Sequence, residues 1–278
     1  MLAVEEARKV FQPGTPNEHV ALDELSIDLK EGEVVTLIGS NGAGKSTLLN
    51  AITGGFLLDG GRVVLGGEDI TWLPPHKRAF MIGYLFQDPL KGTAPGMTIE
   101  ENLALACSRH STPQGGGIFG FLKRWPLRPG INKKDSALFR DLLARFGMGL
   151  EDRMETRAGL LSGGQRQALA LLMATAANPR LLLLDEHTAA LDPAAAEKIM
   201  AITRETVKER NLTTMMVTHN IQQALRFGTR TVMLEDGRII LDISGEERNK
   251  MTIPRLMELY SQHSRKGQPL DNDRMLLE

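Results

Sequence analysis

Short apolar runs separated by helix-length segments give this chain an alternating pattern of strands and helices. The runs predicted to be strands are short, apolar and partly β-branched: Val34–Ile38, Ile82–Phe86, Leu181–Asp185, Thr213–Thr218 and Thr231–Leu234. Helix-like segments lie between several of them. Parallel strands need such crossover segments, and the helices then cover both faces of the sheet. The pattern therefore predicts an α/β fold with a mostly parallel sheet.

The alternation breaks between residues 88 and 160. This part carries two helix-like runs, Thr98–Arg109 and Lys133–Phe146, and no convincing strand. Glycine and proline between 113 and 130 predict a loop. We therefore expect a helical subdomain inserted into an α/β core. The predicted division is a core at 1–87 and 161–245, the inserted helices at 88–160, a C-terminal helix at 246–266 and a polar tail at 267–278, with one domain spanning 1–266.

The net charge and the cysteine content limit which binding partners and which cellular compartment are expected. The formal net charge is −1, so nothing predicts nucleic acid as a bulk electrostatic partner. The single cysteine, Cys107, excludes an internal disulfide and suits a reducing compartment. No apolar run approaches the roughly 18 residues of a membrane span, and the first residues lack the apolar segment of a secretory signal. We expect a cytoplasmic protein that reaches a membrane only through a partner.

Residues 39–47 read GSNGAGKST and fit the pattern G-x-x-x-x-G-K-[ST]. They follow a strand-like run and open a helix-like run, which is the context that this phosphate-binding motif needs; a flexible glycine turn is the alternative. Glycines let backbone N–H groups turn toward an anion, and the helix N-terminus adds the positive end of its dipole. Lys45 can reach the β- and γ-phosphates of a nucleotide, and the Ser46 hydroxyl can ligate Mg²⁺. The predicted phosphate-binding residues are Gly39, Ser40, Asn41, Gly42, Ala43, Gly44, Lys45, Ser46 and Thr47.

A second apolar run, Leu181–Leu184, ends in two acids, Asp185 and Glu186. In phosphoryl-transfer sites, an acid at the carboxyl end of a strand holds Mg²⁺ opposite the phosphate loop. Neighbouring side chains leave a strand on opposite faces, so the next acid can act as a general base on the attacking water. On its own the pair could be the solvated end of a strand. The upstream phosphate loop favours Asp185 as a metal ligand and Glu186 as the base.

Residues 161–165 read LSGGQ. Ser162 can cap a helix that runs to about Ala177, and the glycines leave its first N–H groups open to an anion. With these motifs the chain resembles the ATP-binding cassette ATPases over nearly its whole length. The resemblance implies a P-loop NTPase core with antiparallel N-terminal strands and an inserted α-helical subdomain. It also implies ATP and Mg²⁺ as ligands and a head-to-tail homodimer, in which one subunit completes the nucleotide site of the other through Ser162, Gly163, Gly164 and Gln165.

The resemblance assigns four further residues. It implies that Gln87 senses Mg²⁺ and water, that Asp192 links the two active sites, that His219 holds the γ-phosphate, and that Phe11 stacks on adenine. Taken singly, a glutamine or histidine after a strand is more often structural, and Phe11 could be a core residue. In sum, the implied catalytic residues are Lys45, Gln87, Glu186 and His219, and the implied metal ligands are Ser46, Gln87 and Asp185.

Two departures from the common family pattern indicate which subfamily the chain resembles. His187 follows the catalytic acid where proline is usual, and no arginine follows LSGGQRQ where many members carry one. Neither change removes a contact to phosphate, metal or water. Residues 87–106, 160–193 and 237–248 are similar to ATPase subunits of bacterial uptake systems for tryptophan and related aromatic amino acids.

The resemblance implies an importer subunit at the inner face of the cell membrane. Its partners would be polytopic permease subunits and, indirectly, an extracytoplasmic solute-binding protein. Residues 88–100 are expected to receive a short permease helix, with Phe119–Trp125 near the membrane surface. For residues 115–130, an ordinary loop folded on its own subdomain is the alternative. An exporter subunit and a soluble ATPase of iron–sulfur cluster assembly are the alternatives. DNA-repair and translation cassette proteins would carry long heptad insertions or a second cassette, neither of which this sequence shows.

Overall fold

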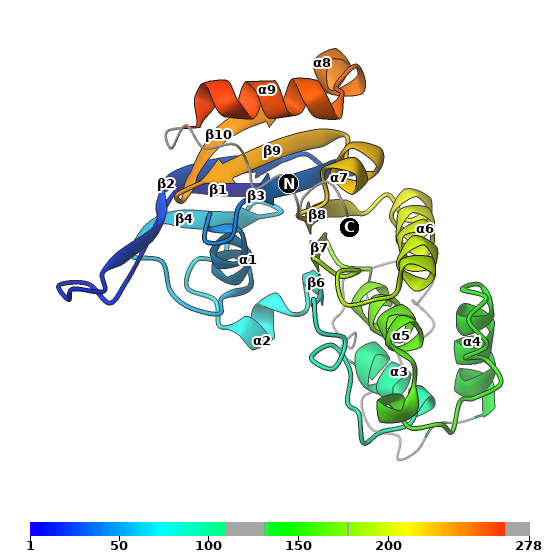
Figure 1. Cartoon of the computed structure of the whole chain (residues 1–278). Coiled ribbons are helices and arrows are strands. Elements are labelled where there is room, and N and C mark those ends of the chain that lie inside the picture. Colours follow the sequence, from blue (N-terminus) through cyan, green and yellow to red (C-terminus); the bar gives the residue numbers. More distant parts are fainter. Residues whose placement is uncertain (109–130, 132, 177, 265–278) are drawn as a thin grey trace. The chain divides into compact units, whose positions relative to one another are not determined.

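The computed structural model describes residues 1–108, 131, 133–176 and 178–264 (Figure 1). The chain forms two compact units. The first combines Met1–Ala79 with the chain from Leu212 onwards, and the second is Phe80–Asn211. Among the residues that the structure describes, no helix is long and apolar enough to cross a membrane.

An antiparallel sheet opens the first unit, as predicted for the N-terminal strands. Its order is β2-β1-β4-β5, and every neighbouring pair is antiparallel. One face is apolar because Leu2 and Val4 alternate with more exposed residues along the first strand. The strands are β1 (Leu2–Phe11), β2 (His19–Leu29), β4 (Gly60–Leu65) and β5 (Glu68–Asp69).

Buried strands of the first unit carry the phosphate loop. β3 (Val34–Gly39) lies between β8 (Thr213–Val217) and β9 (Arg230–Glu235) and is parallel to both. β10 (Arg238–Ile243) pairs antiparallel with β9. The predicted strands in this region are confirmed to within one residue at each end. Their near-continuous burial explains why they read as apolar runs without alternation.

Apart from the short helix at Pro75–Arg78, the helices of the first unit pack on these strands (Figure 1). The segment expected to be one C-terminal helix forms two, because the Thr252 hydroxyl accepts the Arg255 N–H and begins a new helix there. Pro254 in its first turn has no N–H with which to continue an earlier helix. The helices are α1 (Lys45–Thr53), α2 (Pro75–Arg78), α7 (Ile221–Phe227), α8 (Gly245–Asn249) and α9 (Ile253–His263).

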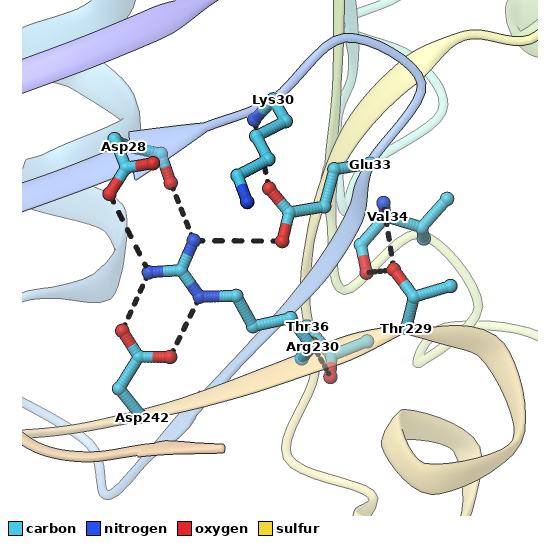
Figure 2. Close-up of polar contacts among 8 residues, drawn as sticks. All are labelled: Asp28, Lys30, Glu33, Val34, Thr36, Thr229, Arg230 and Asp242. Carbon is cyan, nitrogen blue, oxygen red and sulfur yellow. Dashed lines mark hydrogen bonds and ion pairs between the residues drawn. The ribbon is translucent and has the colours of Figure 1, made fainter. Parts of the chain in front are cut away.

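Arg230, the first residue of β9, joins the two sheets of the first unit (Figure 2). Its Nε and Nη2 atoms lie 2.7 and 2.6 Å from the two carboxylate oxygens of Asp242. Its Nη1 donates to the backbone oxygen of Asp28 in β2 at 2.8 Å, and the Glu33 carboxylate lies 3.6 Å from it. The Asp28 carboxylate lies 3.9 Å from Nη2, so one guanidinium contacts three carboxylates on three segments.

The second unit holds two parallel strands and four α-helices within the described residues. β6 (Ile82–Leu85) pairs with β7 (Leu181–Asp185), and Leu181–Leu184 are fully buried. The predicted helices are confirmed, each ending within two residues of its expected limits. The predicted loop and the predicted polar tail lie outside the described part of the chain. They are residues 113–130, which include the apolar residues between 118 and 125, and residues 267–278. The limits of the inserted subdomain stay a prediction. The helices are α3 (Ile99–Ser108), α4 (Lys133–Ala144), α5 (Gly163–Thr175) and α6 (Pro193–Glu209).

Candidate functional site

The loop from β3 to α1 has the conformation of an anion-binding turn. Gly42 and Gly44 have φ of 82° and 103°, a region in which a side chain is strained. Close packing adds a second requirement, since a Cβ on Gly39 would lie 2.5 Å from the Leu234 oxygen, and one on Gly44 2.6 Å from the Ala21 oxygen. Helix α1 begins at Lys45, and its first turn carries no acidic residue, so its positive dipole end faces the loop uncompensated.

Lys45 folds back over this loop. Its Nζ donates hydrogen bonds to the backbone oxygens of Gly39 at 2.7 Å and Ser40 at 3.0 Å, and the residue is only 7 % exposed. Asn41, Gly42 and Ser46 are exposed, while Thr47 is half-buried. The loop therefore exposes Asn41, Gly42 and Ser46 to solvent, while the Lys45 ammonium is held against two of its backbone oxygens.

Arg78 fixes the far end of α1, a role that the sequence did not indicate. Its guanidinium is buried and donates to the Ala51 and Ile52 oxygens at 2.7 and 2.8 Å, which satisfies carbonyls of the last helical turn. Gly54 ends the helix with φ of 82°, and a Cβ there would lie 2.9 Å from Arg78 Nε. The helix that begins at the phosphate loop is thus held at both ends.

Phe11 ends β1 and is 38 % exposed, so it is not a core residue. Its ring meets the ring of Phe56 edge to face, with 5.6 Å between centroids. Lys9 Nζ lies 5.3 Å from the Phe56 centroid and 3.0 Å from an Asp59 carboxylate oxygen. Phe56 and Lys9 were not predicted from the sequence. An exposed aromatic pair backed by a cation is a surface on which a planar base can stack.

His219 lies in a short connection whose backbone is fixed on both sides. Thr218 Oγ1 accepts the Asn220 N–H at 3.0 Å, and the Asn220 side chain accepts the Gln223 N–H at 2.9 Å and caps α7. The histidine is half-buried between the end of β8 and this cap. The backbone that follows His219 is therefore fixed by hydrogen bonds of its neighbours.

Asp185 and Glu186, in the second unit, mark the point where β7 ends. The Tyr84 hydroxyl donates a 2.8 Å hydrogen bond to Asp185 Oδ2, a contact that the sequence did not predict. Glu186 lies beyond the strand and has φ of 43°. Strand alternation therefore does not determine the direction of its side chain, in contrast to the sequence argument. A non-glycine residue in this region costs about 1–3 kcal/mol, and such residues cluster at functional sites.

His187, the departure from the common pattern, is a core residue. It is buried, and its Nε2 lies 3.3 Å from Thr203 Oγ1 of α6. Burial lowers the pKa of His187 to about 4, so the imidazole is neutral at physiological pH. His187 therefore packs the segment that carries Asp185 and Glu186 onto α6.

The LSGGQ segment forms a capping box at the start of α5. Ser162 Oγ accepts the Gln165 N–H, and the Gln165 side chain accepts the Ser162 N–H, both at 3.3 Å. The Gln165 side chain also donates to the Met148 oxygen at 3.2 Å. The predicted N-cap and helix are confirmed, and the structure gives Gln165 a role in fixing the cap.

The loop that carries Asp192 packs against this signature segment. The Asp192 carboxylate caps α6 by accepting the Ala195 N–H at 3.0 Å. A Cβ on Gly163 would lie 3.2 Å from Leu191 Cδ2, and one on Gly164 would lie 3.0 Å from the Ala195 Cβ. The absence of side chains on Gly163 and Gly164 therefore permits this contact.

The predicted site residues divide between the two units. The first unit holds Phe11, residues 39–47 and His219. The second unit holds Gln87, Ser162–Gln165, Asp185, Glu186 and Asp192. Gln87 is exposed and directly follows Phe86, whose backbone oxygen accepts a 3.3 Å hydrogen bond from Gln167 of α5.

Comparisons with known proteins identify the family. The ABC transporter family model matches residues 22–189. The chain is 38 % identical over 260 residues to a tyrosine transport ATP-binding protein of Clostridioides difficile, covering 94 % of this chain and 98 % of that protein. It is 35 % identical over 244 residues to a lipoprotein-releasing system ATP-binding protein of Ruegeria sp., covering 86 % and 97 %.

A solved structure extends these similarities to the fold. The dimeric structure of a post-hydrolysis state of the ATP-binding cassette MJ0796, bound to ADP and Pi, matches with a TM-score of 0.69 and 28 % identity. The match covers 88 % of this chain and 98 % of that one. The chain belongs to the ABC transporter family and is one of its ATP-binding ATPase subunits.

Proposed function

We propose that this protein hydrolyses MgATP to drive a membrane permease, with the phosphates held by residues 39–47. The observation that carries the proposal is the geometry of that loop. The loop combines two left-handed glycines, a helix N-terminus whose first turn carries no acidic residue, and the Lys45 ammonium, which donates to the Gly39 and Ser40 oxygens of the same loop. A triphosphate is the ligand whose charge and size suit this arrangement. Phe11 and Phe56 supply the stacking surface for adenine.

The chain offers three oxygen donors suited to Mg²⁺, one in the first unit and two in the second. The Ser46 hydroxyl is exposed in the first turn of α1, Asp185 ends a buried strand, and Gln87 is exposed after another strand. Mg²⁺ prefers such hard oxygen ligands and is usually bound through one or two carboxylates, with phosphates and water completing its coordination. We assign these three residues to the metal that accompanies ATP.

In the proposed reaction, Glu186 takes a proton from the attacking water. The water oxygen bonds to the γ-phosphorus while the bond to the β,γ-bridging oxygen breaks, and ADP carries away that electron pair. Lys45 and the loop N–H groups stabilise the charge on the transferred phosphoryl group. His219 orients the γ-phosphate and the water.

Two copies of the chain form the active assembly in this proposal. Ser162, Gly163, Gly164 and Gln165 of one subunit meet the γ-phosphate held by the other, and Asp192 links the two sites. The dimeric structure of the related cassette supports this arrangement. The capping box supports it chemically, since it orders the first turn of α5 while the helix N-terminus remains an anion site.

We assign the transported solutes to the aromatic amino acids. The relative named for tyrosine transport aligns with nearly the whole of both chains and at higher identity than the lipoprotein-releasing relative, which represents the exporter alternative. In this proposal the protein lies at the inner face of the membrane, bound to polytopic permease subunits that receive solute from an extracytoplasmic binding protein. Uptake of labelled tyrosine or tryptophan by reconstituted vesicles distinguishes import from export, and co-purification of a polytopic protein excludes the iron–sulfur alternative.

The proposed permease contact uses residues 88–100. Leu90 and Met97 are 45 % and 41 % exposed there, which suits an apolar docking surface. Replacing both by Asp should abolish uptake in reconstituted vesicles while the isolated subunit keeps its ATPase activity. Leu57→Asp alters a similarly exposed apolar residue of the first unit and serves as the control. Normal uptake by the Leu90→Asp/Met97→Asp variant would exclude this docking surface.

The nucleotide proposal is tested by Lys45→Ala. Loss of a hydrogen bond to a charged group costs about 1.5–3 kcal/mol, so ATP affinity should fall about tenfold or more. Calorimetric titration with MgATP measures this change. Lys77→Ala removes an exposed lysine of the same unit and should leave affinity unchanged. Equal affinity in the Lys45→Ala and Lys77→Ala variants would refute the assignment of the loop.

A further inference from the structure

The turn between β9 and β10 contacts both the phosphate loop and the antiparallel sheet. Gly237 N donates a 3.0 Å hydrogen bond to the oxygen of Ala43, a residue of the phosphate loop. On its other side, the Gly237 oxygen accepts the Asp23 N–H of β2 at 3.1 Å. One residue of the turn therefore bridges the loop proposed to hold the phosphates and the sheet that carries Phe11.

The β9–β10 turn, the phosphate loop and β2 are closely packed at this bridge. Asp236 and Gly237 have φ of 46° and 75°, the pair of left-handed residues that a tight two-residue hairpin turn requires. A Cβ on Gly237 would lie 2.8 Å from the Ala21 oxygen and 3.0 Å from the Leu22 Cα. A Cβ on Gly44 of the phosphate loop would lie 3.3 Å from the Gly237 Cα. Since three backbone segments are in contact here, a shift of the turn must shift the loop or β2.

Helix α9 is attached to the same turn through Glu235. The buried Glu235 carboxylate ends β9, and the Tyr260 hydroxyl donates to its Oε1 at 3.0 Å. Ser264 Oγ donates to the same oxygen at 2.6 Å. Tyr260 is itself buried in a cluster with Ile38 of β3 and Met233 of β9. A buried carboxylate is costly without such donors, so α9 constrains where β9 ends.

We propose that Tyr260 is a positioning residue for ATP binding, acting through Glu235 and the Gly237 turn on the phosphate loop. The proposal rests on the function assigned above to residues 39–47. The loop binds phosphate best when its N–H groups are already in place, because ordering them on binding costs affinity. Release of the turn from α9 therefore weakens ATP binding. The effect should appear in the Kd and KM for ATP and leave kcat nearly constant.

The first test removes the donors and keeps the packing. Tyr260→Phe retains the buried ring, and Tyr260→Phe/Ser264→Ala leaves Glu235 Oε1 without either hydroxyl. The double variant should raise the Kd and KM for ATP about three- to tenfold, with kcat within about twofold of wild type. Tyr260→Phe alone should have a smaller effect in the same direction. A variant with a lowered melting temperature but unchanged Kd and KM would show that the contact is merely structural and would overturn the proposal.

The second test introduces a methyl group into the bridge. Gly237→Ala places a Cβ against β2, and should raise the KM for ATP about tenfold or more. Gly67→Ala is the matched control, because Gly67 has φ of 82° and nothing lies within 4 Å of its Cβ position. Both variants bear the cost of a left-handed alanine, and only one disturbs the bridge. Equal KM values for the two variants would contradict the proposal.

The Lys45→Ala variant separates this inference from the proposed function. If Lys45→Ala binds ATP normally, the loop assignment fails. If Lys45→Ala loses affinity while the Tyr260→Phe/Ser264→Ala variant keeps it, only the positioning role fails. Should Gly237→Ala not fold, the Tyr260→Phe/Ser264→Ala variant decides alone.

Discussion

Tyr84 and Asp185 lie on adjacent parallel strands, and the Tyr84 hydroxyl donates a hydrogen bond to Asp185 Oδ2 across 2.8 Å. Burial, together with the neighbouring carboxylate, raises the pKa of Tyr84 above its usual value, so the phenol remains a donor at any physiological pH. The bond occupies one oxygen of Asp185 and restricts its rotation. A carboxylate held in this way is oriented before a metal ion reaches it.

Tyr84→Phe should weaken the use of Mg²⁺ more than the binding of nucleotide. The ring is retained, but Asp185 loses its orienting donor. Outer partners of this kind typically contribute tenfold or more to metal affinity, so we expect the Mg²⁺ concentration for half-maximal ATPase activity to rise about tenfold. ATP binding in EDTA should be unchanged. A Mg²⁺ dependence identical to wild type would exclude a role for this hydrogen bond.

The sequence predicts elements well here and long-range side-chain contacts poorly. Leu181–Asp185 was recognised because a fully buried parallel strand is an uninterrupted apolar run. Nothing local marks the Tyr84 hydroxyl as the partner of Asp185, since the residues are 101 positions apart. The left-handed φ of Glu186 is equally invisible in the sequence, because glutamate does not signal this conformation as glycine, asparagine or aspartate does.

The C-terminal segment shows a different limit of prediction from the sequence. Thr252 and Pro254 are signals for the start of a new helix, and the prediction of one helix at 246–266 did not use them. The bridge from Gly237 to Ala43 joins residues 194 positions apart through backbone atoms alone, so side-chain identity could not reveal it. Arg78 likewise reads as an ordinary surface arginine, although it is buried against the end of α1.

Arg230→Ala should destabilise the first unit. The change leaves the carboxylates of Asp28, Glu33 and Asp242 close together without the shared cation (Figure 2). Removing one partner of a partly buried ion pair leaves uncompensated charge, so we expect a loss of about 2–3 kcal/mol in the free energy of unfolding. Urea unfolding monitored by circular dichroism measures the loss. Arg230→Lys keeps the charge without the bidentate geometry and should lose less.

Arg255→Ala is the matched control for Arg230→Ala. Arg255 also forms a 2.6 Å ion pair, with Glu258, but both side chains are exposed on α9. Surface pairs contribute about 0–1 kcal/mol, so this variant should unfold almost as wild type does. Equal losses in the two variants would contradict the view that Arg230 holds the two sheets together.

The buried His187 should make stability depend on pH below about 6.5. Its pKa is about 4 in the folded protein and 6.5 in an unfolded chain. Above the unfolded value the imidazole is neutral in both states and its contribution to stability is complete. As the pH falls from 6.5 toward 4, the unfolded chain binds a proton that the folded protein does not, and the free energy of unfolding falls. Between about pH 7.5 and about pH 5, this group should account for a loss of about 2 kcal/mol.

His187→Gln isolates that contribution. Carboxylates titrate in the same pH range and contribute to both proteins. The change in unfolding free energy between the two pH values is therefore measured for wild type and for the variant, and the two changes are compared. The variant should lose about 2 kcal/mol less than wild type over this range, whatever its stability at neutral pH. Parallel curves for the two proteins would mean that His187 is solvated or charged in the folded state.

Glu186→Gln should trap the nucleotide-bound dimer. Glutamine keeps the size of the side chain but cannot accept a proton, so the variant should bind MgATP and stall before hydrolysis. Because Ser162 of the second subunit would complete each site, the stalled protein should elute as a dimer in size-exclusion chromatography with MgATP. Hydrolysis at a near-wild-type rate would remove Glu186 as the base.

The addition of Ser162→Arg to Glu186→Gln should abolish that dimer, because bulk and charge would enter the shared interface. Ser162 also caps α5, so the substitution removes a hydrogen bond worth about 1 kcal/mol to the helix. Ser162→Ala in the same background loses the cap without adding bulk, and should still dimerise at saturating MgATP. If the alanine and arginine variants are both monomeric, dimerisation requires the α5 helix cap, and a direct dimer contact at Ser162 is unsupported. If both are dimers, the LSGGQ segment does not meet the partner's nucleotide.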